Sequence, residues 1–383
     1  MMKSNKFIIY QLVLLSLLVS CSVSKQTTLE KKSTLPSWAL GEFVRPAGVN
    51  PIISPLNTEF FCPIMKENVK WEESDTFNPG AITKDGKIVV LYRAEDNSAQ
   101  GIGQRISRIG YAESTDGISM KRRESPVFYP DNDEYKKYEW PGGCEDPRVA
   151  VTEDGTYVMF YTAWSRTNEI WRLSVATSRD LITWDKHGPI FADAYDGRFK
   201  DFKCKSGSIL TKIKDGKIVV EKIDGKYFMY WGENSVKAAT SEDLVSWTPL
   251  LDENNELLHL AHPRSGYFDS RLTECGPPAL MTDNGIVLLY NGKNGDFGVD
   301  ADDDYPEAAY CAGQFLFDKK DPCKVLDRLD KPFFYPEASF EKSGQYVDGT
   351  VFVQGLAYLN QKFYLYYGGA DSQLGVAIYD SSK

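Results

Sequence analysis

The sequence has few of the residues that build metal centres, and it has no long hydrophobic segment. Its 383 residues include three histidines and seven cysteines, and no two cysteines form a CxxC pair, so a zinc site is not expected. The main apolar run, residues 7–19, contains 13 residues, which is too short to span a bilayer. We therefore expect no metal, no other cofactor and no transmembrane helix.

The sequence also lacks an excess of positive charge. Lysine and arginine number 44 against 54 aspartates and glutamates, which gives a net charge of −10 at pH 7. Nucleic acids and anionic membrane surfaces repel a body of this charge. Neither is therefore an expected partner, and a polyanionic substrate is disfavoured for the same reason.

The N-terminus is typical of a lipoprotein signal. Lys3 and Lys6 precede the run 7–19, which has the length of a signal-peptide core. The run ends in LVSC, which resembles a bacterial lipobox, where the cysteine (here Cys21) is lipidated; a plain secretory signal is the alternative. We expect a signal peptide over 1–20, a lipidated flexible tether over 21–36, and a single folded domain over 37–383. The domain would lie in the cell envelope, periplasm-facing or at the outer-membrane surface, and only the lipid would hold it there.

Six cysteines follow Cys21. Outside the cytoplasm thiols can oxidise, and Cys311 and Cys323 are close enough in sequence to pair. Buried free thiols are the alternative, and the sequence does not decide between the two.

A short strand-like segment that ends in an aromatic residue recurs along the chain. The copies are KIVVLY, TYVMFY, KYFMYW, GIVLLY and KFYLYY, and they end at Tyr92, Tyr161, Trp231, Tyr290 and Tyr367. A turn such as KDG or EDG precedes each copy, and β-branched and aromatic residues dominate it. A second repeat contains Asp116, Asp180 and Asp243, which are expected to be turn residues.

These repeats predict an all-β fold, a five-bladed β-propeller. A pair of β-sandwiches is the alternative, but it would give two-fold rather than five-fold self-similarity. The last repeat ends near the C-terminus, so the ring is expected to close with a strand from residues near 40–65, with EFFCPIM (59–65) as the plausible segment. The first strands of all blades would then begin at one face, around one funnel.

Polar residues occupy the positions that such a funnel would bring together. Asn78 and Asp146 stand at strand starts, Lys205 and Glu274 just before them, and Arg93, Glu233 and Asp371 just past the following strands. Unpaired charges in a narrow cavity are costly, so a charged ring there indicates a binding site. The structural alternatives are that Asn78 and Asp371 only form hydrogen bonds within their own turns and that Lys205 is a solvated charge at the rim. Trp140 lies in the loop before Asp146 and is a candidate for stacking on a sugar.

The motifs FNPGA, GGCEDPR and YYGGADSQLGVA, in this order within five repeats, resemble glycoside hydrolase family 130. That family contains β-mannoside phosphorylases and β-1,2-mannosidases. The resemblance implies that Asp146 is the general acid, which acts through a sugar hydroxyl. It also implies that Asn78, Arg93, Lys205 and Asp371 hold the mannose at the cleavage site.

The two reactions of the family can be separated by charge. A phosphorylase needs cations beside the anomeric carbon to hold phosphate, whereas this sequence has Glu233 and Glu274 at the corresponding places. Two carboxylates would repel phosphate and orient a water instead, as in the hydrolytic members. We therefore expect an exo-acting, inverting hydrolase that releases mannose from β-1,2-linked mannosides, with either glutamate as the base. A phosphorylase and a non-catalytic glycan-binding lipoprotein are the alternatives.

Overall fold

The computed structural model describes residues 35–296, 298 and 300–382. The predicted signal peptide, Cys21 and most of the tether lie outside these residues. Within them, regular structure is almost entirely β: the only helices are the four-residue α1 (Lys136–Glu139) and the 3-10 turns η1 (Arg166–Asn168) and η2 (Ser339–Glu341). No helix of this part of the chain is both long and apolar enough to cross a membrane.

The first large sheet joins two antiparallel groups. Its order is β10–β9–β8–β7–β5–β4–β3, with β6 added to β5, and a parallel bridge between Ser107 and Gly143 connects β5 to β7. The strands are β3 (Asp75–Lys84), β4 (Lys87–Glu95), β5 (Ser107–Ser114), β6 (Lys121–Arg122), β7 (Gly143–Val151), β8 (Tyr157–Ser165), β9 (Ile170–Ser178) and β10 (Asp185–Pro189).

The second large sheet is built in the same way, but its two groups join through the parallel pair β11–β19. Its main strands are β16 (Trp247–Pro249), β15 (Val236–Ser241), β14 (Lys226–Trp231), β11 (Gly207–Lys214), β19 (Ala279–Met281), β20 (Ile286–Lys293), β21 (Tyr310–Phe317) and β22 (Val325–Arg328). Four short strands flank them: β12 (Lys217–Val220), β13 (Lys222–Ile223), β17 (His259–Ala261) and β18 (Leu272–Cys275).

The remaining strands form two small sheets. One contains β23 (Val351–Leu359), β24 (Lys362–Gly369) and β25 (Gln373–Asp380), and the other pairs β1 (Glu59–Cys62) with β2 (Glu67–Lys70). Of the range near residues 40–65 that was expected to close the ring, the named segment 59–65 is the wrong part, because β1 pairs with β2 rather than with the last sheet. Val44 and Ile53 bridge to β25 instead, at Ile378 and Leu374.

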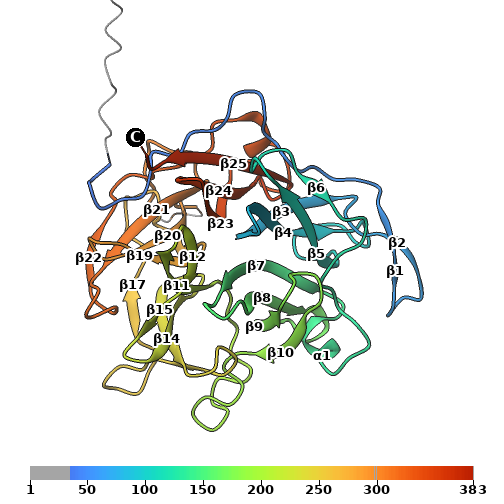
Figure 1. The fold of residues 1–383 in the computed structure, drawn as a ribbon, viewed down its shortest axis with the longest axis horizontal. Helices are drawn as coiled ribbons and strands as arrows, with labels where there is room; N and C mark the ends of the chain where they lie inside the picture. The colour runs from blue at the N-terminus through green and yellow to red at the C-terminus, as the bar shows by residue number, and fades with distance from the viewer. Residues whose placement is uncertain (1–34, 297, 299, 383) are drawn as a thin grey trace, which may run out of the picture. The chain divides into compact units, whose positions relative to one another are not determined.

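The sheets stand around a common centre and give a propeller-like fold, with β7, β11 and β23 near the centre and β10 and β22 far from it (Figure 1). The recurrent strands predicted from the sequence are the second strands of their hairpins. They read as nearly continuous apolar runs because both faces are covered: every residue of β4 after Lys87 is buried.

Close contacts between first strands hold the centre together. A Cβ at Gly80 would lie 2.7 Å from the Pro147 carbonyl oxygen, so only glycine allows β3 and β7 to approach this closely. The buried side chain of Gln354 donates hydrogen bonds to the carbonyls of Asn78 (2.7 Å) and Pro147 (2.9 Å). Three first strands, β3, β7 and β23, are therefore tied together at one point.

The second sequence repeat has the role that was expected of it. The Asp116 Oδ1 accepts hydrogen bonds from the backbone amides of Ile118 (2.8 Å) and Ser119 (2.7 Å), and Asp180 and Asp243 repeat this pattern. These aspartates close tight turns, which confirms the prediction. Cys311 and Cys323 are free thiols in this structure, the first buried and the second partly exposed.

Candidate active site

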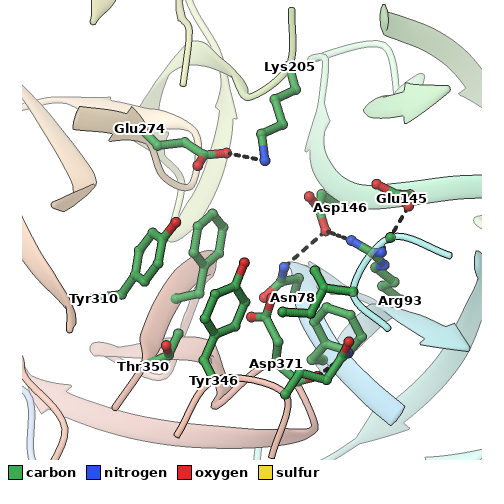
Figure 2. Close-up of a pocket in the computed structure, with 15 residues that line it drawn as sticks. Asn78, Arg93, Glu145, Asp146, Lys205, Glu274, Tyr310, Tyr346, Thr350 and Asp371 are labelled. Carbon is green, nitrogen blue, oxygen red and sulfur yellow. Dashed lines mark hydrogen bonds and ion pairs between the residues drawn. The ribbon is translucent and has the colours of Figure 1, made fainter. Parts of the chain in front are cut away.

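A cavity of about 160 Å³ lies where the first strands converge, and six of the residues predicted to form the site line it (Figure 2). They come from six places in the chain: Asn78 in β3, Arg93 in β4, Asp146 in β7, Lys205 before β11, Glu274 in β18, and Asp371 after β24. The fold therefore brings together residues that lie up to almost 300 positions apart in sequence, as the repeat pattern predicted.

Two β-bulges aim the side chains of Asn78 and Asp146 at the cavity. The register of β3 shifts between Phe77 and Pro79, and that of β7 shifts between Glu145 and Arg148. Asn78 (φ 42°) and Asp146 (φ 50°) adopt left-handed backbone conformations, which are uncommon outside glycine. Each stands directly before a proline, in the pairs Asn-Pro and Asp-Pro. Proline has no backbone N–H to donate to the neighbouring strand, which is consistent with a bulge at these positions.

Asp146 is buried and strongly held. Its Oδ1 accepts a hydrogen bond from the Asn78 amide at 3.0 Å and another from the Arg93 guanidinium at 3.1 Å. Burial opposes ionisation of this carboxyl. The positive charges of Arg93, Lys205 and Arg148 and the hydrogen bond from Asn78 outweigh burial and hold the pKa of Asp146 below its usual range. Asp146 is therefore a carboxylate at neutral pH.

Arg93 serves three carboxylates at once. Besides Asp146, it contacts Glu95 at 2.6 Å and Glu145 at 2.9 Å (Figure 2). One guanidinium cannot neutralise three acids, and the consequence appears at Glu145. Burial, with the charges of Asp146 and Glu95, raises the pKa of Glu145 to about 7 against the pull of Arg93.

Asp371 carries a proton at neutral pH. Burial raises its pKa to about 8, and the negative charges of Asp146 and Glu95 act in the same direction against Arg93 and Lys205. Its Oδ1 atom is shielded from solvent and has no hydrogen-bond partner within the described residues, and the same holds for Asn78 Oδ1 and Thr350 Oγ1. Because an unpaired buried polar atom is costly, these three atoms indicate a ligand rich in hydroxyl groups.

Glu274 and Glu233 flank the ammonium group of Lys205. The distances from Nζ are 3.4 Å to Glu274 Oε1 and 3.7 Å to Glu233 Oε2. Glu274 is buried and accepts a hydrogen bond from the Ser206 hydroxyl at 2.5 Å. Burial is the main reason that its pKa is raised. Lys205 therefore stands between two acids and is not a free anion-binding group.

Glu233 does not line the main cavity. It faces an adjoining cavity of about 240 Å³, which shares Gly103, Glu145 and Lys205 with the first and is otherwise lined by Thr162, Trp164, Trp171 and Glu233. The predicted pair of glutamates thus meets at Lys205, with Glu274 on one side and Glu233 on the other.

Trp140 is the one predicted site residue that the fold does not bring to either cavity. It follows α1, and its carbonyl accepts a hydrogen bond from the Ser165 hydroxyl at 3.4 Å. Sequence proximity to Asp146 was misleading because the bulge turns β7 inward while the preceding loop stays outside. The aromatic residues that line the two cavities are instead Phe77, Tyr310, Tyr346, Phe352, Trp164 and Trp171. Trp164 and Trp171 follow the predicted strand that ends at Tyr161. Arg93, Glu233 and Asp371 were found just past such strands, and the same criterion could have identified these two tryptophans.

Residues 51–383 match the family model Glyco_hydro_130, described as β-1,4-mannooligosaccharide phosphorylase. A 1,2-β-oligomannan phosphorylase from Thermoanaerobacter sp. (strain X514) is 33% identical over 316 residues, which cover 82% of this chain and 92% of that protein. Among solved structures, a glycosyl hydrolase from Bacteroides ovatus is 60% identical with a TM-score of 0.89, covering 91% of this chain and 96% of its own.

A further solved structure was reported with the statement that the GH130 family of mannoside phosphorylases contains glycoside hydrolases that target β-1,2 mannosidic linkages in Candida mannan. It is 62% identical to this chain with a TM-score of 0.90, and the match covers 92% of this chain and 98% of the other. Similarity of sequence and of fold thus extends over the whole described domain and includes its cavity.

Proposed function

The chain belongs to glycoside hydrolase family 130, and we propose that it is an exo-acting, inverting hydrolase that releases mannose from β-1,2-linked mannosides. The substrate class follows the names of its relatives, which act on β-1,2-linked oligomannan or are described with β-1,2-mannosidic linkages. The unpaired oxygens of Asn78, Thr350 and Asp371 suit the hydroxyl groups of one mannose unit.

One observation carries the choice of water over phosphate: Lys205 lies between Glu233 and Glu274. A phosphate dianion at this place would meet two carboxylates for one ammonium group. A water molecule needs an acceptor for its proton, and these carboxylates supply one. The greater similarity to the β-1,2-mannosidic hydrolases supports the same choice, although the 33%-identical relative is a phosphorylase.

Inversion requires an acid and a base on opposite sides of the anomeric carbon, with about 6.5–9.5 Å between their carboxyl groups to admit water. We assign Asp146 as the acid and the glutamates at Lys205 as the water side. Asp146 is ionised in the arrangement described above and must gain a proton before it can donate one. A bound sugar that displaces water from this cluster raises the cost of the Asp146 charge, and so raises its pKa. Asn78, Arg93, Lys205 and Asp371 are proposed to hold the mannose.

The experiment is mannose release from β-1,2-mannobiose in buffer without phosphate and again with added phosphate, followed by NMR. We expect two mannose molecules per substrate molecule, the first-formed product being the α-anomer, at a rate that phosphate does not change. Formation of mannose 1-phosphate in the presence of phosphate, with no turnover in buffer without phosphate, would establish the phosphorylase alternative.

We also infer that the sheets form five blades. Five antiparallel groups support this number: those led by β3, β7, β11, β19 and β23, each corresponding to one copy of the sequence repeat. The parallel bridges β5–β7 and β11–β19 are then contacts between neighbouring blades rather than parts of a blade.

The proposed cellular context is the cell envelope, with residues 1–20 as the signal peptide and Cys21 as the lipidated N-terminus of a tether that reaches to residue 36. The proposal rests on the sequence LVSC and on the apolar run before it. A lipid-anchored exo-enzyme at this location would meet mannosides that come from outside the cell.

A further inference from the structure

We propose that Trp171 is a positioning residue that holds the carboxylate of Glu233, and that Glu233 rather than Glu274 is the base that activates water. This inference rests on the proposed hydrolytic function. It concerns the smaller cavity beside the main one, where Trp171, Trp164 and Glu233 meet.

The contact itself is direct. The indole N–H of Trp171 donates a hydrogen bond of 2.8 Å to Glu233 Oε1. The second oxygen, Oε2, lies 3.7 Å from the Lys205 ammonium, beyond normal hydrogen-bond distance. One oxygen is thus fixed, and the other keeps lone pairs that a water molecule can use.

The indole is itself fixed. Trp164 and Trp171 face each other across the hairpin of β8 and β9 in register, and their rings pack edge to face with centroids 6.0 Å apart. The indole N–H of Trp164 donates to the Gly103 carbonyl at 3.0 Å, in the loop that borders both cavities. The ammonium group of Lys203 lies 4.9 Å from the centre of the Trp171 ring. Trp171 therefore offers its donor from a rigid support.

Glu274 lacks the surroundings of a base. Its side chain is 2% exposed, against 22% for Glu233, and one of its oxygens is engaged by the Ser206 hydroxyl and Lys205. Only Glu233 of the two opens onto the smaller cavity, so water reaches it without passing the bound sugar. Glu274 is placed instead to hold Lys205 and to face the sugar.

Several charged groups surround Glu233. Lys205 lies 3.7 Å from it, Lys237 and Glu274 interact with it, and Glu145 lines the same cavity. The ammonium of Lys237 lies behind the Glu233 loop, where it donates to the Ser235 hydroxyl at 2.8 Å. The Trp171 indole differs from all of them because it alone donates a hydrogen bond of normal length to Glu233.

In the step that follows, the water oxygen bonds to the anomeric carbon from the Glu233 side and one water proton moves to Glu233. The bond between the anomeric carbon and the glycosidic oxygen breaks. That oxygen takes the proton of a sugar hydroxyl, and Asp146 gives its own proton to this hydroxyl oxygen. The indole N–H donates to the ionised carboxylate, so its loss removes a hydrogen bond that favours this form and frees the rotation of Glu233.

The test compares Trp171→Phe with Trp164→Phe in hydrolysis of β-1,2-mannobiose. Both variants keep an aromatic ring and lose one N–H, but only Trp171→Phe loses the bond to Glu233. We expect Trp171→Phe to lower kcat roughly 10–100-fold with KM almost unchanged. The acidic limb of its pH profile should move up by about one pH unit, while that of Trp164→Phe stays in place.

The base is identified by chemical rescue of Glu233→Gly and Glu274→Gly with azide. Azide should restore turnover only in Glu233→Gly and give α-mannosyl azide, in which a C–N bond replaces the broken glycosidic C–O bond. A rise in KM without a pH shift in Trp171→Phe would make Trp171 a sugar platform, and rescue of Glu274→Gly alone would make Glu274 the base. Either result overturns the inference if the wild-type enzyme hydrolyses β-1,2-mannobiose without phosphate. A wild-type enzyme that requires phosphate for turnover would overturn the proposed function instead.

Discussion

Asn78 and Asp146 lie on different strands, yet each occupies a bulge before a proline with a left-handed backbone, and a hydrogen bond of 3.0 Å joins Asn78 Nδ2 to Asp146 Oδ1. The same local device in two repeats thus creates one amide–carboxylate pair at the floor of the cavity. The amide donates to the ionised form of Asp146, so the pair contributes both to the geometry of the carboxyl and to its proton affinity.

The first prediction concerns the proposed acid. Asp146→Asn preserves shape but cannot donate the proton, so turnover of an unactivated mannoside should fall about 10²–10⁴-fold. The thermal unfolding midpoint should show that the variant folds. Asp193→Asn, an exposed aspartate, is the matched control and should keep wild-type activity. Near-normal turnover by Asp146→Asn would remove Asp146 from the role of acid.

The second prediction uses the shared guanidinium. The pKa of Glu145 is about 7, so Glu145 becomes negative as the pH rises through neutrality and then opposes ionisation of Asp146. Glu145→Gln removes that charge and leaves Arg93 freer to stabilise the Asp146 carboxylate. The pKa of the acid should therefore fall, and the alkaline limb of kcat/KM should move to lower pH. An unmoved limb would show that the two carboxyls do not interact in catalysis.

The third prediction concerns stability. The pKa of Asp371 is about 8 in the folded protein, far above its ordinary value of 3.8, so the folded state binds the extra proton between these values. The contribution of Asp371 to the free energy of unfolding therefore falls as the pH rises from about 4 to about 8, and it is smallest at high pH. Asp371→Asn should flatten this dependence by on the order of 1 kcal/mol or more, measured by urea unfolding at pH 5 and pH 8. Equal slopes in the two proteins would contradict it.

The fourth prediction concerns the nucleophile. Removing the charges of both Glu233 and Glu274 by Gln substitution leaves Lys205 without its two acids. The double variant should bind inorganic phosphate with an affinity at least about tenfold above that of the wild type, since about 1.4 kcal/mol of removed repulsion is enough for that factor. Isothermal titration would detect it. The control is the triple variant Glu233→Gln/Glu274→Gln/Lys205→Met, in which the increase in phosphate affinity should be lost.

The fifth prediction concerns the N-terminus. Cells that express the full chain with a labelled fatty acid should show label in the protein, and Cys21→Ala should abolish it. The variant protein should then leave the membrane fraction, because the lipid is the proposed anchor. Label that persists in Cys21→Ala would place the acyl group on another residue.

The sequence alone determined the β-architecture and the positions of most polar residues in the cavity. Hairpins with a spacing of about 70 residues repeat along the chain, and a fold made of equivalent units superimposes equivalent positions. For that reason Asn78, Asp146 and Lys205 could be assigned to one cavity before any coordinate was known. The bulges at Asn78 and Asp146 were not predicted, since the sequence indicated only that both residues stand at strand starts.

Only the tertiary structure decided which groups share a charge and which aromatic ring meets the site. Glu145 and Glu95 come to the same guanidinium as Asp146, and burial together with these shared charges raises the pKa of Glu145 while that of Asp146 is lowered. Likewise, Trp171 reaches Glu233 from a neighbouring group of strands, whereas Trp140, much closer to Asp146 in sequence, stays outside. Electrostatic and hydrogen-bond energies depend on distances between side chains, and a linear pattern does not contain those distances.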